Sequence, residues 1–255
     1  MSLERLQPGT DDWLRYHADH TQRYRFFTSR YPNASVLDMA CGVGYGSFMI
    51  SNSGAKEVLG IDISDEAILF AKNNYQNTNL DFQLLDLSDV PKLGRRFDLV
   101  ISFETIEHLP NPERLVEVAN VVLNPGGRFV CSTPNKAKYS GSGIFNPYHV
   151  SELFYQDFQS LFAKYFRLER QYHQTESLSF QRFLFVQDEI NALKSNLRQT
   201  PINRFKRLIR SAFGDDSKPP KAPEIFLPKE SDFDLEQFTA FRDDFSVIIL
   251  EGTKR

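Results

Sequence analysis

Short apolar segments alternate with helical segments through the first two-thirds of this 255-residue chain, and this alternation restricts the possible folds most strongly. The residues from 64 to 75 form the clearest helical segment, because they begin with a serine cap and two acids. Strands and helices in this order need right-handed crossovers and a parallel sheet with helices on both faces. The predicted strands, each short and bounded by turn residues, are 35–40, 57–63, 80–87, 97–104 and 127–133.

Both ends of the chain extend this pattern. Residues 10–30 predict one or two helices, which end at Pro32 and Asn33. Beyond the fifth strand we expect a helix at 151–165, a strand at 166–174 and a final strand at 245–253. The stretch between these last two strands is less regular, and it predicts helices at 184–197, 203–213 and 234–244 and a loop at 215–231.

The predicted fold is therefore α/β, with a doubly wound, seven-stranded, mostly parallel sheet in one domain that spans residues 1–255. Within that domain we expect a helical cap at 1–30, a central core at 30–174, an insertion at 175–244 and a last strand at 245–255. The insertion is rich in aromatic residues, so we expect it to cover the site or to join copies in a homo-oligomer.

Composition excludes several classes of protein. The net charge of −3 offers no general footprint for nucleic acid. No apolar run approaches the roughly 20 residues that cross a bilayer, and the first residues lack the apolar core of a signal peptide. Cys41 and Cys131 fall at predicted strand ends, which argues against a disulfide framework. We therefore expect a cytoplasmic protein with no transmembrane segment and no nucleic-acid partner.

A glycine-rich turn, CGVGYG, follows the first strand and places Gly42, Gly44 and Gly46 before a helix. Glycines let the backbone approach a ligand closely, and dinucleotide enzymes use such turns too. Here Ser47 replaces the third glycine of the dinucleotide motif, and Asp38 would repel a pyrophosphate but attract an ammonium group. A nicotinamide oxidoreductase is therefore disfavoured.

Acids recur at the ends of the next two strands. Asp62 lies where a ribose diol would bind, and Asp86 suits an adenine amino group. Together with Asp38 they predict a cationic ligand that carries a nucleoside. The alternative is that Asp38 and Asp86 are only turn acids.

The ordered motifs VLDMACGVGYGS, LGIDIS, LLDLSD and VVLNPGGRFVCSTPN resemble those of class I S-adenosylmethionine-dependent methyltransferases over roughly residues 30–170. The resemblance implies a cofactor-binding core at 30–174 and S-adenosyl-L-methionine as the cofactor. It implies that Arg23 and Tyr24 hold the cofactor carboxylate and that Phe103 lies behind the sulfonium. The remaining contacts that it implies are Asp38, Ala40, Gly42 and Gly44 with the methionine part, Asp62 and Ile63 with ribose and adenine, and Asp86 and Leu87 with adenine.

The loops after the fourth and fifth strands carry the candidate catalytic groups. FETIEHL places Glu104, Glu107 and His108 in E-x-x-E-H spacing, and NPYHVSEL adds His149. The pattern resembles the metal site of small-RNA 2′-O-methyltransferases and of ubiquinone-biosynthesis O-methyltransferases, which implies that these four residues bind a divalent ion such as Mg²⁺. Without a metal, His108 or His149, with Glu107 beside them, would act as the general base. The alternative is that the acids only favour a helix start and that His149 only packs.

Three other features of the sequence each allow a plainer alternative. Residues 132–149 are either a mobile flap over the acceptor or a plain loop, with Tyr148 as a pocket wall. The basic stretch at 193–221 docks a phosphate-bearing substrate or a membrane, or is a solvated helix face. His17, His20 and His173 are interpreted as surface or packing residues.

The leading functional hypothesis is O-methylation of a sugar hydroxyl in a nucleotide-linked sugar, glycan or glycosylated metabolite, because the motifs after the fourth and fifth strands resemble those of bacterial glycan methyltransferases. A phenolic or quinone-precursor acceptor is the alternative within the same class, since Phe180, Phe183 and Phe185 would suit a flat ring. A third hypothesis concerns a different class of protein, a catalytically inactive scaffold that binds a nucleoside.

Overall fold

The computed structural model describes residues 11–139, 146–176, 233–237 and 246–255. The helices expected at 184–197 and 203–213, the loop at 215–231, the basic stretch at 193–221 and the phenylalanines at 180, 183 and 185 therefore lie outside the described residues. So does most of the glycine-rich part of the expected flap.

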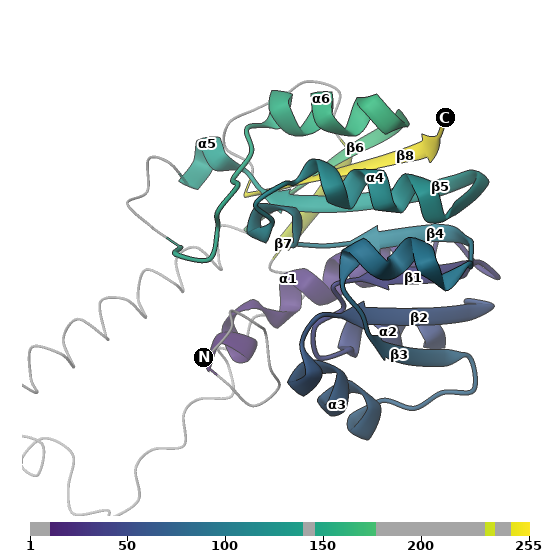
Figure 1. Cartoon of the computed structure of the whole chain (residues 1–255). Coiled ribbons are helices and arrows are strands. Elements are labelled where there is room, and N and C mark those ends of the chain that lie inside the picture. The colour runs from purple at the N-terminus through teal and green to yellow at the C-terminus, as the bar shows by residue number, and fades with distance from the viewer. Residues whose placement is uncertain (1–10, 140–145, 177–232, 238–245) are drawn as a thin grey trace, which may run out of the picture.

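An eight-stranded sheet in the order β3-β2-β1-β4-β5-β8-β6-β7 forms the centre of the molecule (Figure 1). The pairs from β3 through β5 are parallel, whereas β8, β6 and β7 join as antiparallel strands. The strands are β1 (Ser35–Met39), β2 (Glu57–Asp62), β3 (Leu80–Leu84), β4 (Phe97–Ser102), β5 (Leu123–Pro134), β6 (Phe166–Glu176), β7 (Phe233–Gln237) and β8 (Val247–Lys254). The predicted doubly wound, mostly parallel sheet is confirmed.

Helices cover both faces of this sheet, and helices α4 and α6 lie together over one of them (Figure 1). Helix α1 packs against α2 over the other face, where α3 covers β2 and β3. The helical elements are α1 (Asp11–Thr28), α2 (Tyr45–Asn52), α3 (Asp65–Asn74), α4 (Glu113–Val122), α5 (Lys136–Tyr139), α6 (Tyr155–Tyr165), and the 3₁₀ turns η1 (Leu87–Leu93) and η2 (Ile106–His108).

Strand alternation explains why separate hydrophobic clusters form on the two faces of the sheet. In β1, Leu37 and Met39 pack with the α4 and α6 side chains, whereas Val36 packs with Tyr24 and Phe27 of α1. Successive strand residues point to opposite faces, so a strand buried on both faces is apolar throughout. Ser35 and Asp38 are the polar exceptions in this strand, and the charged Asp38 is fully buried on the α1 face.

The structure corrects one helix and adds one strand. Residues 233–237 form β7, paired antiparallel with β6, although the sequence predicted a helix at 234–244. Backbone pairing along the β6 edge overrides the weak helical pattern of DLEQF. The serine cap of the 64–75 helix is confirmed, because Ser64 Oγ accepts a hydrogen bond from the backbone N–H of Ala67 (3.2 Å).

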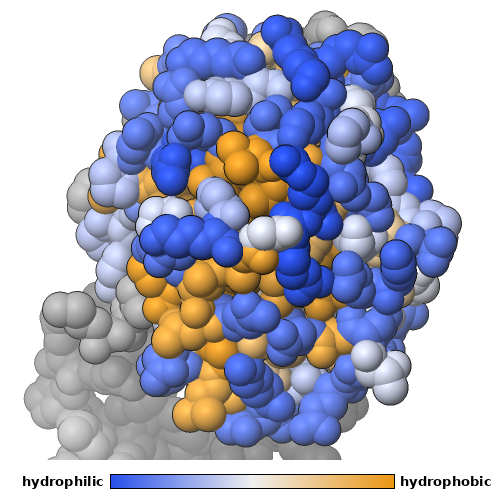
Figure 2. Space-filling model, turned by 45° about the vertical axis from the view of Figure 1, so that its right-hand side comes forward, coloured by the Kyte–Doolittle hydropathy of each residue, from blue (hydrophilic) through white to orange (hydrophobic). Residues whose placement is uncertain are grey.

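The exterior is mixed in polarity. Figure 2 shows hydrophobic side chains near the centre and lower part of one face, bordered by hydrophilic ones. In the part of the chain that the structure describes, no helix is both long enough and apolar enough to cross a membrane.

Candidate active site

Asp38 lies near the carboxyl end of β1 and is held by two hydroxyl groups. Tyr24 of α1 donates to its Oδ1 (3.2 Å), and Ser47 of α2 donates to its Oδ2 (2.6 Å). Burial raises the pKa of Asp38 to about 7, although both hydrogen bonds oppose this shift. The carboxylate is therefore costly to ionise until a cation lies beside it.

The turn between β1 and α2 has a backbone that few residues adopt. Ala40, Gly42 and Gly44 have φ of 61°, 56° and 87°. At Gly44 a Cβ would lie 2.6 Å from the Cβ of Ala71, so only glycine fits there. Positive φ at Ala40, which carries a side chain, is unfavourable, and such strain clusters where a chain contacts ligands.

The acid that ends β2 and the acid that follows β3 have different environments. Asp62 is buried, and its carboxylate accepts from the backbone N–H groups of Gly42 (3.0 Å) and Ser64 (2.9 Å). It thereby links the glycine turn to the start of α3. Asp86 is exposed and caps η1 through Ser88, whose hydrogen bonds lower the pKa of Asp86 below its ordinary value.

Apolar residues flank these acids at the same edge. Ile63, directly after β2, is 67% exposed, although a side chain of this size is usually buried. Leu87 is half-buried against the α4-side core. Phe103, directly after β4, packs edge-to-face on Tyr24 with 5.0 Å between the ring centroids. The exposed Ile63 and the half-buried Leu87, each beside an acid, suit a ligand with a flat ring and polar edges.

Arg23 lies beside Tyr24 on α1 and is completely buried. Its Nη1 donates to Asp19 Oδ2 (3.3 Å) and to Gln174 Oε1. Its Nε and Nη2 are buried and have no acceptor among the described residues. A buried guanidinium with two unpaired donors suits an anionic ligand group.

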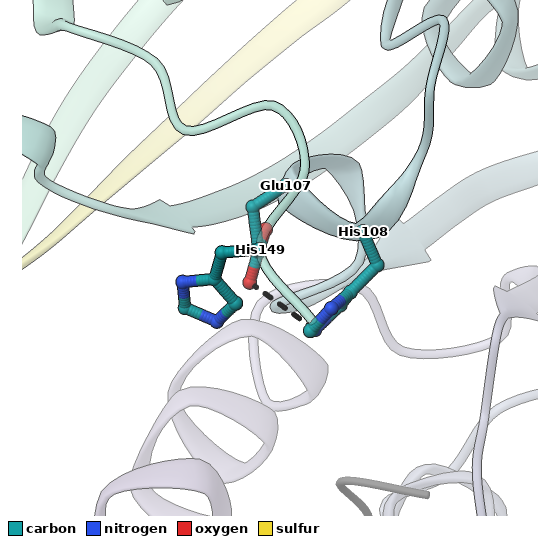
Figure 3. A group of neighbouring side chains, drawn as sticks. All are labelled: Glu107, His108 and His149. Carbon is teal, nitrogen blue, oxygen red and sulfur yellow. Dashed lines mark ion pairs between the residues drawn. The ribbon is translucent and has the colours of Figure 1, made fainter. Parts of the chain in front are cut away.

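Glu107, His108 and His149 come together at the carboxyl edge of β4 (Figure 3). One ligand atom from each lies within 4.8 Å of the others, and His108 Nε2 is 3.8 Å from Glu107 Oε1. Glu107 and His108 belong to η2, whereas His149 belongs to the segment before α6. These three predicted site residues are thus brought together by the fold.

Hydrogen bonds orient each member of this group. The ring Nδ1 of His108 donates to the Tyr148 carbonyl (3.0 Å), and the ring Nδ1 of His149 donates to Glu152 (3.0 Å). In neutral imidazoles this assignment places the lone pairs on the Nε2 atoms. The backbone N–H of Ser151 donates to the Glu107 carbonyl (2.9 Å), which fixes the segment that carries His149 against η2.

Glu107 is 1% exposed, and only one of its oxygens is hydrogen-bonded within the described chain. Thr133 donates to Oε2 (3.1 Å), while Oε1 faces His108. Burial, together with the charge of Glu104, raises the pKa of Glu107 well above its ordinary value. An oxygen of this kind can accept a proton or bind a cation.

Glu104, the fourth residue of the predicted metal set, is not part of this group. Its Oε1 accepts from Ser132 of β5 (2.6 Å), and its backbone has φ of 51°. The E-x-x-E-H spacing predicts one helical face for these residues, but only residues 106–108 form a helical turn, and Glu104 precedes it.

Several contributing residues escaped the sequence-based prediction. Ser132 and Thr133 hold the two glutamates, and Glu152 orients His149. Only the position of the STPN segment at a predicted strand end could have indicated the first two. Gln174 gave no signal, because its contact with Arg23 spans 151 residues of sequence.

Comparison with known proteins shows which family the chain belongs to. A family model described as a methyltransferase domain matches residues 31–182. A "probable S-adenosylmethionine-dependent methyltransferase" of Mycolicibacterium smegmatis is 31% identical over 152 residues, which are 59% of this chain and 58% of that protein. The ubiquinone biosynthesis O-methyltransferase of Coxiella burnetii is 36% identical over 103 residues, which are 40% of this chain and 44% of that protein.

The fold is also found among solved structures. The N-methyltransferase NodS from Bradyrhizobium japonicum, in complex with S-adenosyl-L-homocysteine, aligns with a TM-score of 0.53 at 18% identity, covering 68% of this chain and 88% of that one. This likeness concerns the fold alone. The chain spans about half the length of the curated relatives that it matches. Because the family model covers more than half of the chain and the sheet has the matching topology, this chain belongs to the S-adenosylmethionine-dependent methyltransferase family.

Proposed function

We propose that the chain binds S-adenosyl-L-methionine at the carboxyl edge of β1, β2 and β4 and transfers its methyl group to a hydroxyl oxygen. The carrying observation is the convergence of Glu107, His108 and His149 after β4, which pairs in parallel with β1, the strand that leads into the strained turn at residues 40–44. The residues proposed for the cofactor are Asp38, Ala40, Gly42, Gly44, Asp62, Ile63, Asp86, Leu87, Phe103 and Tyr24.

Charge and exposure support the cofactor part of the proposal. The buried carboxylate of Asp38 suits the ammonium group of the cofactor, and the unpaired donors of Arg23 suit its carboxylate. Asp62 suits the ribose hydroxyls, while Ile63 and Leu87 would pack on the adenine with Asp86 at its edge. The bound cofactor supplies an activated methyl group on a positively charged sulfur.

The protein's contribution to transfer is to hold the acceptor and to remove its proton. A hydroxyl placed beside the Nε2 atom of His108 or His149 loses its proton to the imidazole as its oxygen takes the methyl group. Glu107 Oε1 lies 3.8 Å from His108 Nε2, and the imidazolium would favour the ionised form of Glu107 against the burial that raises its pKa; that carboxylate then stabilises the cation. Thr133 and Glu152 keep these groups in position.

The same three residues fit a divalent metal ion, which would lower the pKa of a bound hydroxyl. The buried Oε1 of Glu107 and two imidazoles form a mixed oxygen and nitrogen donor set. Mg²⁺ prefers oxygen ligands, and Glu104, the second acid, is held by Ser132 instead. We therefore propose Mn²⁺ or Zn²⁺ in preference to Mg²⁺.

Two acceptor classes follow from different observations. The motifs around Glu107 and His149 resemble those of bacterial glycan methyltransferases, which favours the sugar hydroxyl of a nucleotide-linked sugar or glycan. Similarity to the ubiquinone biosynthesis O-methyltransferase of Coxiella burnetii favours a phenolic acceptor as the second candidate. A panel of both acceptor types, scored by methyl transfer, separates them.

The proposal extends to the cellular compartment, the binding partners and the oligomeric state of the protein. Cys41 and Cys131 are buried free thiols, which fits a reducing cytoplasm. We propose a small-molecule or glycan partner and no nucleic acid. A homo-oligomer joined through residues 175–244 stays a proposal, and light scattering of the full chain tests it.

Mutation of Glu107 tests the catalytic proposal. Glu107→Gln should lower kcat by roughly 10²-fold or more, because it removes the charge that supports proton transfer. S-adenosylhomocysteine affinity, measured by calorimetry, should stay unchanged. Glu117→Gln, which alters a surface acid paired with Arg114, is the matched control and should retain activity.

Other results would change the proposal. Binding of S-adenosylhomocysteine without transfer to any acceptor would favour a nucleoside-binding scaffold. The metal is tested by Mn²⁺ binding to the wild type and to His149→Gln, together with activity after chelation. Full activity after chelation and equal Mn²⁺ binding by both proteins would contradict the proposed metal site. Catalysis by a general base would then stand alone.

A further inference from the structure

Gln174 of β6 is a buried polar residue to which the proposed reaction assigns no role. It is 2% exposed and faces α1, far from its own position in the sequence. Its Nε2 donates to the backbone carbonyl of Asp19 (3.0 Å) and to Gln22 Oε1 (2.5 Å), while its Oε1 accepts from Arg23 Nη1. A single amide therefore contacts three residues of one helix.

The contact fixes which donors of Arg23 stay available. Nη1 is shared between Asp19 and Gln174, which leaves Nε and Nη2 as the donors without acceptors in the described chain. The guanidinium is planar, so holding Nη1 from two sides also sets the direction of the other two donors. These donors can then bind a planar carboxylate through two parallel hydrogen bonds.

Charge is a second reason for an amide at position 174. Asp19 already lies against Arg23, and Glu104 acts on the same guanidinium electrostatically. A neutral amide orients Arg23 without adding another negative charge that would compete with a ligand carboxylate.

We propose that Gln174 is a positioning residue, which aims Arg23 at the carboxylate of S-adenosylmethionine and so makes affinity depend on that group. This inference rests on the proposed function. It assigns no contact between Gln174 and the cofactor or the acceptor. It predicts that loss of Gln174 weakens ligands with the carboxylate and spares ligands without it.

The experiment compares two ligands in calorimetry with the full chain. S-adenosylhomocysteine carries the carboxylate, and its decarboxylated form keeps the ammonium group that Asp38 would bind. Gln174→Met should weaken S-adenosylhomocysteine about tenfold, which corresponds to ~1.4 kcal/mol. The decarboxylated ligand should change by less than about twofold, because no interaction that it makes is lost.

Control variants separate positioning from folding. Gln171→Met on the same strand removes an acceptor for Tyr155 and Gln159, and it should change neither affinity. In an Arg23→Met background, Gln174→Met should have no further effect on S-adenosylhomocysteine. Should Gln174→Met fail to fold, Gln174→Glu keeps the acceptor for Arg23, and its added charge should again weaken only the carboxylated ligand.

Failure of the proposed function and failure of the positioning role of Gln174 would give different results. A wild-type chain that binds neither ligand would contradict the proposed function itself. A wild type that binds both, with Gln174 variants that weaken both ligands equally or neither of them, would overturn only the positioning role.

Discussion

Asp38 combines full burial with a carboxyl group at the centre of the proposed cofactor site. Its two hydrogen bonds come from neutral hydroxyls, and burial raises its pKa to about 7. Because this value lies above the ordinary 3.8, folding favours the protonated acid, and the stability that this provides falls as pH rises from about 4 to about 7. The carboxyl group of Asp38 is therefore protonated more readily than an ordinary aspartic acid, and a cation bound beside it would favour its ionised form.

Cofactor affinity should depend on pH for this reason. Below pH 7 the ligand ammonium has to displace a proton from Asp38, so the Kd for S-adenosylhomocysteine should rise by about tenfold per pH unit between pH 7 and pH 5. Calorimetry over that range measures it. Asp38→Asn mimics the protonated acid and should bind weakly with a flat profile. A flat profile in the wild type would contradict the assignment.

At the scale of single residues, the sequence indicated which residues belong to the candidate site better than it indicated their contacts. The acids at strand ends follow from the strand pattern, since the carboxyl ends of parallel strands share one edge. The three-residue group of Glu107, His108 and His149 was predicted, but Glu104 was added to it because spacing cannot reveal where a helical turn begins. Gln174 could not be predicted, because only the sheet order places β6 beside α1.

The turn from β1 to α2 shows how an element limits its own sequence. Gly44 and Gly54 have nearly the same φ, +87° and +88°. At Gly44 a Cβ would meet Ala71 and Phe82 below 3.0 Å, whereas at Gly54 it would meet nothing within 4 Å. The first glycine is thus required by packing and by backbone, the second by backbone alone.

This pair gives a matched prediction at the scale of elements. Gly54→Ala should cost about 1 kcal/mol of unfolding free energy from the left-handed backbone. Gly44→Ala carries the same cost and should lose about 1–3 kcal/mol more from overpacking against α3 and β3. Urea unfolding measures both. Equal losses would show that the turn can shift away from α3.

Elements inside the sheet were easier to predict than those at its edge. Strands β1, β2 and β4 are mainly apolar because both faces are covered, so their pattern is strong. Among the strands that the structure describes, β7 pairs only with β6, and its largely polar sequence carries no such pattern. A prediction from periodicity alone therefore assigned a helix where an edge strand exists.

The last strand joins distant parts of the whole molecule. Strand β8 lies between β5 and β6 (Figure 1), and its residue Glu251 is fully buried. Glu251 accepts hydrogen bonds from Tyr31, which follows α1, from Arg128 of β5 (3.1 Å) and from Arg170 (3.3 Å) and Tyr172 (3.0 Å) of β6. The Glu251 carboxylate of β8 thus links its own strand to β5, to β6 and to the segment after α1.

Removing Glu251 should therefore destabilise the molecule as a whole and leave the chemistry of the site unchanged. Glu251→Ala leaves two tyrosines and two arginines without their acceptor, and we expect a loss of about 3 kcal/mol, because both arginines keep some access to water. Glu169→Ala removes a surface acid paired with Arg167 and should cost about 0.5 kcal/mol. Thermal unfolding compares the two variants.

Ligand discrimination should survive this loss of stability. Because Glu251 lies outside the Asp19, Arg23 and Gln174 contacts, the folded fraction of Glu251→Ala should still discriminate S-adenosylhomocysteine from its decarboxylated form. Loss of that discrimination would mean that the last strand, and not Gln174 alone, sets the position of α1.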